Sequence, residues 1–211
     1  MKSKLFVAFL LCVSALHAQN DSSTVLNHEL YLSGGASYPY LPVETRDYWK
    51  TGWNIGAGYG VSFEPGEVGY GSLLATVEYT RFAFNQSRFA SGNNLTHPNL
   101  LISRNPSNAF TLLVNFKGTF FVVGQHSIRP YFLLGVGYTN VFIASVGVSG
   151  DTTFSVESQS QSCVAWSAGL GLEYPVTDSF TAFVQGKSIL GVADPTRQFF
   201  PVSTGIRYRF E

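Results

Sequence analysis

Residues 53–63 read WNIGAGYGVSF, and in this stretch large apolar side chains alternate with small or polar ones. Trp53, Ile55 and Tyr59 fall on one parity, and the residues of the other parity are asparagine, glycine and serine. Because successive side chains of a β-strand point to opposite faces, this period of two predicts a strand with one apolar face and one face of small residues. The stretch is longer than the ~5–6 residues of an ordinary strand, as expected of a strand that crosses a membrane at a tilt.

Seven further runs of similar length repeat this alternation, and no helical periodicity follows the first residues of the chain. The runs lie at residues 28–38, 72–84, 108–121, 129–143, 162–174, 179–190 and 199–210. The connections between the eight runs are alternately long and short; the long ones are residues 39–51, 85–107, 144–161 and 191–198, and the short ones are residues 64–71, 122–128 and 175–178. An even number of strands with one looped end and one tight end is typical of outer-membrane barrels. We therefore predict an all-β fold, an eight-stranded antiparallel up-and-down transmembrane β-barrel.

The composition also favours a membrane. Charged residues make up 12 % of the chain and aromatic residues 15 %, whereas soluble domains carry about 25 % charged residues. Beyond the N-terminus, no segment has the ~18 consecutive apolar residues of a membrane helix. Any membrane-spanning elements must therefore be strands.

Alternation alone leaves the direction of the apolar face open. A lipocalin-like carrier would turn that face inward around a ligand and its polar face to water, but its polar face should then be rich in charge. Here the polar face is mostly Gly, Ser, Thr and Asn, which suit the crowded lumen of an eight-stranded barrel. We expect the apolar face to contact lipid, and a secreted carrier of an apolar ligand is the less favoured alternative.

Aromatic residues gather near both ends of the predicted strands, as in the interfacial girdles of membrane barrels. Those near the looped end are Tyr38, Trp53, Phe82, Phe84, Phe110, Phe142 and Trp166, and those near the tight end are Phe63, Phe120, Phe132, Tyr174, Phe180, Tyr208 and Phe210.

The N-terminus predicts export. Lys2 and Lys4 precede an apolar run and small residues, the pattern of a cleaved signal peptide. We assign residues 1–18 to the signal peptide, 19–27 to a short periplasmic segment and 28–211 to the barrel. Without the two lysines the chain has 11 basic and 13 acidic residues, so no nucleic-acid partner is expected. Cys163 would then be the sole cysteine, and we interpret it as a packing residue.

The last residues, 202–211, read VSTGIRYRFE. On its pattern the whole exported chain resembles the small outer-membrane β-barrel families of the OmpA-barrel and OmpX-like kind, and specifically the outer membrane protein beta-barrel domain group of Gram-negative bacteria. In that family a final strand with a polar residue, a glycine and an aromatic-x-aromatic pair is the signal for the barrel-assembly machinery. The resemblance assigns that signal to Thr204, Gly205, Tyr208 and Phe210, with Glu211 as a departure at the end. It also implies an outer-membrane location, with outer-membrane lipid and lipopolysaccharide as partners.

Several ionisable residues fall on the parity of the predicted lumen, namely Glu29, Glu78, Lys117, Glu173, Lys187, Arg207 and Arg209. Charge inside a membrane-spanning barrel is costly unless it is paired. We predict that Glu78 lies near Lys117 and that closure of the barrel brings Glu29 beside Arg207 or Arg209. Such pairs would plug and rigidify the lumen; a narrow pore for small solutes is the alternative.

No catalytic or metal site is predicted, and neither is a cofactor. His126 and Ser127 lie in a predicted tight turn without an acidic partner in reach, and His97 lies in a long loop with no carboxylate close by in sequence. No histidine pair has metal-ligand spacing. The expected function is therefore structural or surface interaction, without enzymatic activity. It would reside in the loops at residues 85–107 and 144–161, which we expect to be polar and mobile and to bind a surface ligand or shield the barrel.

Overall fold

The computed structural model describes residues 27–63, 71–93, 95, 101–120, 128–150 and 153–210. The predicted signal peptide at residues 1–18 lies outside these ranges, as do His97, His126, Ser127 and Glu211. The boundaries proposed for the signal peptide and the periplasmic segment therefore remain predictions.

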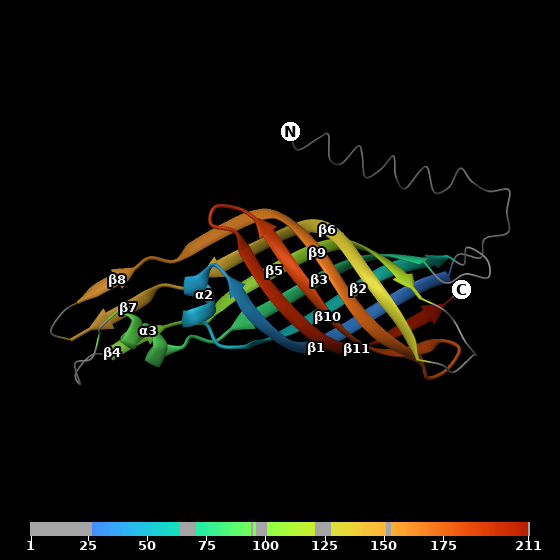
Figure 1. Cartoon of the computed structure of the whole chain (residues 1–211), viewed down its shortest axis with the longest axis horizontal. Helices are drawn as coiled ribbons and strands as arrows, with labels where there is room; N and C mark the ends of the chain where they lie inside the picture. Colours follow the sequence, from blue (N-terminus) through green and yellow to red (C-terminus); the bar gives the residue numbers. More distant parts are fainter. Residues whose placement is uncertain are drawn as a thin grey trace.

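Eight strands close into an antiparallel barrel in which each barrel strand pairs with the next barrel strand along the chain (Figure 1). They are β1 (Asn27–Leu41), β2 (Gly52–Phe63), β3 (Gly71–Phe82), β5 (Ser107–Thr119), β6 (Arg129–Ile143), β9 (Gln159–Pro175), β10 (Phe180–Val192) and β11 (Arg197–Phe210). The first and last strands close the barrel, with His28 opposite Phe210 and Ala36 opposite Val202. The prediction of an eight-stranded up-and-down barrel is confirmed, and each strand lies within a few residues of its predicted run.

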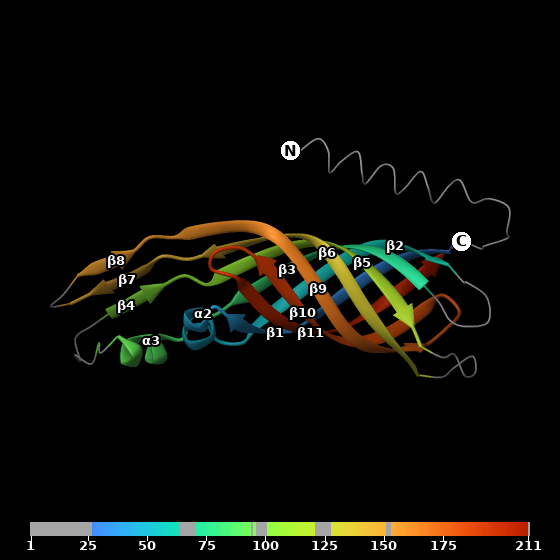
Figure 2. The same ribbon diagram turned by 45° about the horizontal axis from the view of Figure 1, so that its top comes forward.

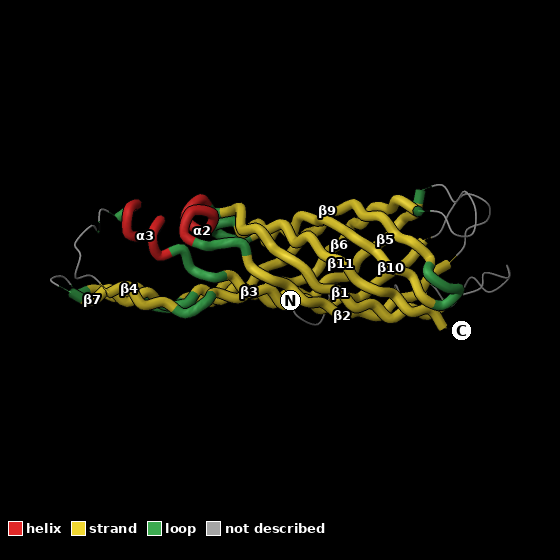
Figure 3. Tube along the Cα trace, turned by 90° about the horizontal axis from the view of Figure 1, so that it is seen from below, coloured by secondary structure: helices red, strands yellow, loops and turns green. Residues whose placement is uncertain are grey.

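The remaining elements gather at the looped end of the barrel (Figures 1 and 3). They are the helices α2 (Val43–Tyr48) and α3 (Gln86–Gly92) and the strands β4 (Leu101–Arg104), β7 (Val146–Ser149) and β8 (Phe154–Val156). The three strands form a second sheet in the order β4-β7-β8, which extends away from the barrel (Figure 2). The connections at residues 85–107 and 144–161, which the sequence indicates only as polar loops, thus contain short elements that were not predicted. None of the helices in the described ranges is long and apolar enough to cross a membrane, a result that concerns helices alone.

The two faces of the barrel wall are as predicted. In β2, Trp53, Ile55 and Tyr59 are exposed on the outside, whereas Asn54 and Ser62 are buried in the lumen. The same alternation holds in the other strands, so leucine, valine and aromatic side chains cover the outside. This orientation contradicts a lipocalin-like carrier, whose apolar face would enclose a ligand.

Two of the aromatic residues predicted for the looped-end band, Phe82 and Phe84, do not lie exposed on the outer wall. Trp53, Phe110 and Trp166 are exposed on the outer wall. Phe82 instead faces the lumen, where it is only 1 % exposed, and Phe84 is half-buried against α3. Phe82 falls on the inward parity of β3, between the exposed Arg81 and Ala83, so it packs the barrel interior instead of the membrane interface.

Candidate functional site

The tight-turn end of the lumen holds a network of buried charges from four strands. Lys117 of β5 pairs with Glu173 of β9, with Nζ 2.7 Å from Oε2. Arg207 of β11 donates to the same Glu173 and to both carboxylate oxygens of Glu29 on β1, the latter at 3.3 Å. Arg209 lies 3.7 Å from Glu29 and is the one partly exposed member. Glu29 therefore lies beside both of its expected partners, Arg207 and Arg209.

A second buried ion pair joins Glu78 of β3 to Lys187 of β10, two strands that lie on opposite sides of the barrel. The predicted pair of Glu78 with Lys117 does not form. In the register of β3 with β5, Lys117 is opposite Ser72 whereas Glu78 is opposite Thr111. The offset of six residues is about 20 Å at ~3.3 Å per residue. Glu78 and Lys117 therefore pair through the lumen with residues of non-adjacent strands, Lys187 and Glu173.

Neutral hydrogen bonds cross the lumen as well. The hydroxyl of Tyr131 donates to Oε1 of Gln185 at 3.1 Å, and Nε2 of Gln185 donates to the Tyr31 hydroxyl at 2.6 Å. The large Tyr131 ring fits because its neighbour on β9 is Gly171, where a Cβ atom would overlap the ring. The buried polar side chains of Tyr131, Gln185 and Tyr31 thus satisfy one another, as buried polar groups require.

The looped end of the lumen is filled by apolar side chains, which we call the outer plug: Trp49, Phe82, Ala109, Leu113, Val141, Ala165, Ile189 and Phe199. Trp49 follows α2 and stacks on Phe82 with ring centroids 5.1 Å apart. Thr45 of α2 accepts a hydrogen bond from Arg197 at 3.1 Å, which ties the helix to β11. The cavity beside the plug has a volume of only about 10 Å³. The sequence had indicated Phe82 as a girdle residue and had no signal for the position of Trp49.

The elements beyond the barrel form a unit that we call the flap, made of β4, β7, β8 and α3. Phe89 of α3 packs with Val146 and Val148 of β7, and all three side chains are buried. Tyr48 of α2 contacts the Phe89 ring edge-on at a centroid distance of 5.2 Å, so the flap is also attached to the barrel mouth. Among the described residues, no strand pairs with the outer edge of β4 or of β8.

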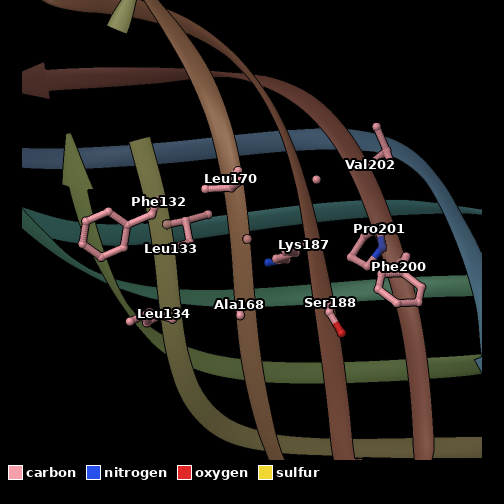
Figure 4. A pocket seen from close by; sticks show the side chains of 12 residues that line it. Phe132, Leu133, Leu134, Ala168, Leu170, Lys187, Ser188, Phe200, Pro201 and Val202 are labelled. Carbon is pink, nitrogen blue, oxygen red and sulfur yellow. The ribbon is translucent and has the colours of Figure 1, made fainter. Parts of the chain in front are cut away.

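A groove of about 570 Å³ lies on the outer wall, over β6, β9, β10 and β11 (Figure 4). Its floor is formed by small residues, Ala168 and Gly186, and Phe132, Leu170 and Phe200 border it. The groove opens toward the membrane-facing side, so it is a depression of the wall and not a ligand chamber inside the barrel.

Comparison with known proteins identifies the family. A family model described as outer membrane protein beta-barrel domain matches residues 5–185. The chain belongs to this family. It is an outer-membrane β-barrel protein, which confirms the resemblance and the location inferred from the sequence. β11 and the end of β10 lie beyond the matched residues and complete the same barrel.

Solved structures similar to this outer-membrane barrel have low sequence identity to it. Neisserial surface protein A is 13 % identical, with 90 % of this chain and 100 % of that chain covered and a TM-score of 0.48. Ail, the attachment invasion locus protein of Yersinia pestis, is 16 % identical, with coverages of 90 % and 100 % and a TM-score of 0.46. The β-barrel domain of Pseudomonas aeruginosa OprF is 13 % identical, with coverages of 86 % and 97 % and a TM-score of 0.44. No curated protein matches the chain. These similarities add nothing on function.

The four residues of the predicted assembly signal lie in β11 of this outer-membrane barrel. Tyr208 and Phe210 face outward at the tight-turn end with ring centroids 5.9 Å apart, and Phe210 stacks on His28 of β1 across the closing seam at 5.7 Å. Thr204 donates to the carbonyl of Phe183 at 3.0 Å. A Cβ atom at Gly205 would collide with the carbonyl oxygen of Leu32, so the close approach of β11 to β1 requires glycine there. Their role in assembly remains a prediction.

His28 and Cys163 are the histidine and the cysteine of the described ranges. No group of three or more His, Cys, Asp or Glu residues there could hold a metal ion. His28 contacts the Tyr59 hydroxyl at 2.5 Å through Nδ1 and stacks between the Tyr59 and Phe210 rings. Cys163 is buried and faces the lumen beside Gly191. Each of these residues has a packing role in the wall or the interior.

Proposed function

We propose that this outer-membrane barrel has no enzymatic activity and binds a surface partner through its flap. The observation that carries the proposal is the β4-β7-β8 sheet, which continues two barrel connections beyond the wall, the one between β3 and β5 and the one between β6 and β9, and is held by an apolar cluster of its own. An ordered sheet at the looped end provides a fixed surface in place of mobile loops. In a barrel of this family the long loops face the exterior.

The edges of the flap are the features best suited to binding. A strand without a neighbour presents a row of backbone N–H and C=O groups that can pair with an extended segment of another protein. β8 offers such an edge, and its Val156 side chain is 48 % exposed. At the other edge Leu101 of β4 is 74 % exposed. Each edge thus offers backbone groups for pairing together with an exposed apolar side chain. β-Strand addition uses both of these features.

The contents of the lumen argue against the alternative of a narrow pore. Charged groups at one end are paired with one another, and apolar side chains fill the other end. A conducting lumen needs a continuous water-filled path, and the paired charges and the outer plug both occupy that path. The barrel is therefore best explained as a rigid support for the flap.

The proposal is tested by comparing cells that express the protein with cells that express Val156→Lys, in binding to a panel of immobilised extracellular-matrix and serum proteins. Lysine on an edge strand opposes pairing with a further strand. We expect at least one panel protein to bind the wild type and to lose most of its binding to the variant.

Val43→Lys is the matched control, because Val43 in α2 has the same residue type and a similar exposure of 49 % at the same end of the barrel. Heat-modifiability on a gel verifies that both variants form the barrel. Equal binding by the wild type and Val156→Lys to every panel protein would refute the proposed role of this edge.

A further inference from the structure

The outer wall of the barrel carries almost no charge. On the outward parity of the eight barrel strands, within the described residues, the only Asp, Glu, Lys, Arg or His residues are His28 and Arg81. His28 lies at the tight-turn end and stacks within an aromatic row. Arg81 is the next-to-last residue of β3 at the looped end, where it is exposed. Among the described residues of the barrel strands, it is thus the one permanent charge on the membrane-facing wall.

The row that contains Arg81 marks the boundary of the membrane. In the sheet Arg81 is opposite Trp53 on one side and Asn108 on the other. Four residues nearer the middle of the strand, the corresponding row is aliphatic, with Val77 between Ala57 and Leu112. Tryptophan and tyrosine collect where lipid headgroups begin, so Arg81 stands at headgroup level in the leaflet that faces the looped end.

Within the described ranges no acidic group forms an ion pair with Arg81. β2 and β5 contain no Asp or Glu, and Glu78 of β3 points into the lumen and pairs with Lys187. Among the described residues no ion pair or hydrogen bond of the Arg81 side chain occurs. A second cation lies close by, since the backbone of Lys50 donates to the carbonyl of Ala83 at 2.8 Å and the Lys50 side chain is exposed.

Neighbouring side chains surround the guanidinium with groups that suit a phosphorylated headgroup. The Trp53 and Tyr79 rings lie 5.6 Å apart at this level. The Tyr79 hydroxyl donates to Oδ1 of Asn108 at 2.8 Å, which orients the amide and leaves its N–H groups to donate elsewhere. Arginine offers a planar set of N–H donors that matches the oxygens of a phosphate. The cluster is therefore rich in donors and cationic, and it borders hydrocarbon.

We propose that Arg81, with Asn108 and Lys50, binds the phosphate of a membrane-lipid headgroup in the leaflet facing the looped end. The lipid is favoured over a soluble anion because the donors continue directly into the apolar wall at Val77 and Leu112, which the acyl chains of the same molecule would cover. This site lies on the outer wall, apart from the flap edges, and does not depend on the partner proposed for the flap.

The test uses Trp53, the direct neighbour of Arg81, as a fluorescent reporter in a Trp49→Phe/Trp166→Phe background. The protein is reconstituted into bilayers of unlabelled phosphatidylcholine that contain either brominated phosphatidic acid or a brominated digalactosyl lipid without phosphate. Bromine quenches the fluorescence of a nearby indole. The ratio of Trp53 quenching by the two lipids therefore measures which lipid is enriched next to Arg81. We expect a preference of about fivefold for the phosphate-bearing lipid, the factor for one basic side chain near a lipid surface.

Arg81→Gln should abolish the preference and Arg81→Lys should retain most of it. Arg88→Gln is the matched control, because Arg88 is an exposed arginine of α3 that forms hydrogen bonds to described residues through its backbone N–H and C=O and not through its side chain. It should leave the preference unchanged. The gel shift on heating verifies that each variant is folded.

A quenching ratio near one for the wild type, or a ratio in folded Arg81→Gln equal to that of the wild type, would overturn the proposal. Sodium phosphate that removes the preference, when sodium chloride of equal ionic strength does not, would show a soluble-anion site and also overturn it.

Discussion

At the scale of single residues, the sequence predicts which charged side chains face the lumen but not which residues they pair with. The period of two in each run indicates that Glu78, Lys117 and Lys187 face inward, because parity is a local property of a strand. The partner of each charge depends on register and on the diameter of the closed barrel, which are not local. Glu78 therefore pairs with Lys187 across the lumen, although Lys117 lies on the adjacent strand.

The pairing of Glu78 is testable by double-mutant cycles. Glu78→Gln leaves the Lys187 charge buried without its partner, and we expect it to lower the free energy of unfolding by roughly 3–5 kcal/mol. Combined with Lys187→Met, the loss should be smaller than the sum of the single losses by about 0.5–3 kcal/mol, whereas with Lys117→Met the losses should add within about 0.5 kcal/mol. Urea unfolding of the barrel in detergent measures each value. Additivity with Lys187→Met would contradict the observed pair.

Phe210 provides a second prediction at this scale. If the end of β11 is the signal for the assembly machinery, Phe210→Ala should lower the amount of heat-modifiable barrel in the outer membrane several-fold, while the purified variant still folds in detergent. Phe180→Ala is the matched control, because Phe180 faces outward at the same end and its ring contacts the Tyr208 ring at a centroid distance of 4.8 Å, but it lies outside the signal. Equal amounts of heat-modifiable barrel in the outer membrane for the two variants would contradict an assembly role for Phe210.

At the scale of elements, the sequence predicts the eight long strands but not the flap. A long alternating run specifies a strand by itself, since each residue repeats the same signal. The strands β4, β7 and β8 are three or four residues long, too short for periodicity to distinguish them from loop. They form because Val146, Val148 and Phe89 pack together, and these residues come from segments far apart in the chain. The helix α2 and the position of Trp49 escape sequence reasoning for the same reason.

The flap is expected to depend on this cluster and not on the barrel. Val148→Asp places a charge where the side chain is 1 % exposed, at a cost of several kcal/mol unless the sheet opens. Limited proteolysis should then cut within residues 86–104 or 144–158, while the barrel keeps its heat-modifiable band. Ser149→Asp is the matched control on the adjacent exposed residue and should resist cleavage as the wild type does. Cleavage at equal rates in the two variants would show that the cluster does not hold the flap.

At the scale of the whole molecule, a closed barrel is filled from end to end by two kinds of interior. Paired charges and hydrogen bonds occupy the tight-turn end, and the outer plug occupies the looped end. The sequence predicted the first interior from the charges on the lumen parity, but not the second, because Trp49 reaches the lumen from a loop. In the described part of the chain both interiors occupy the lumen, which supports our proposals that the barrel does not conduct ions and that it contacts other molecules at its looped end.

The most direct test of this account is the single-channel conductance of the purified, heat-modifiable protein in a planar lipid bilayer. The filled lumen predicts no steady conductance above that of the protein-free membrane, in low or high salt. A reproducible open level that scales with salt concentration would contradict the closed lumen, and with it the view that the barrel serves as a support for its flap.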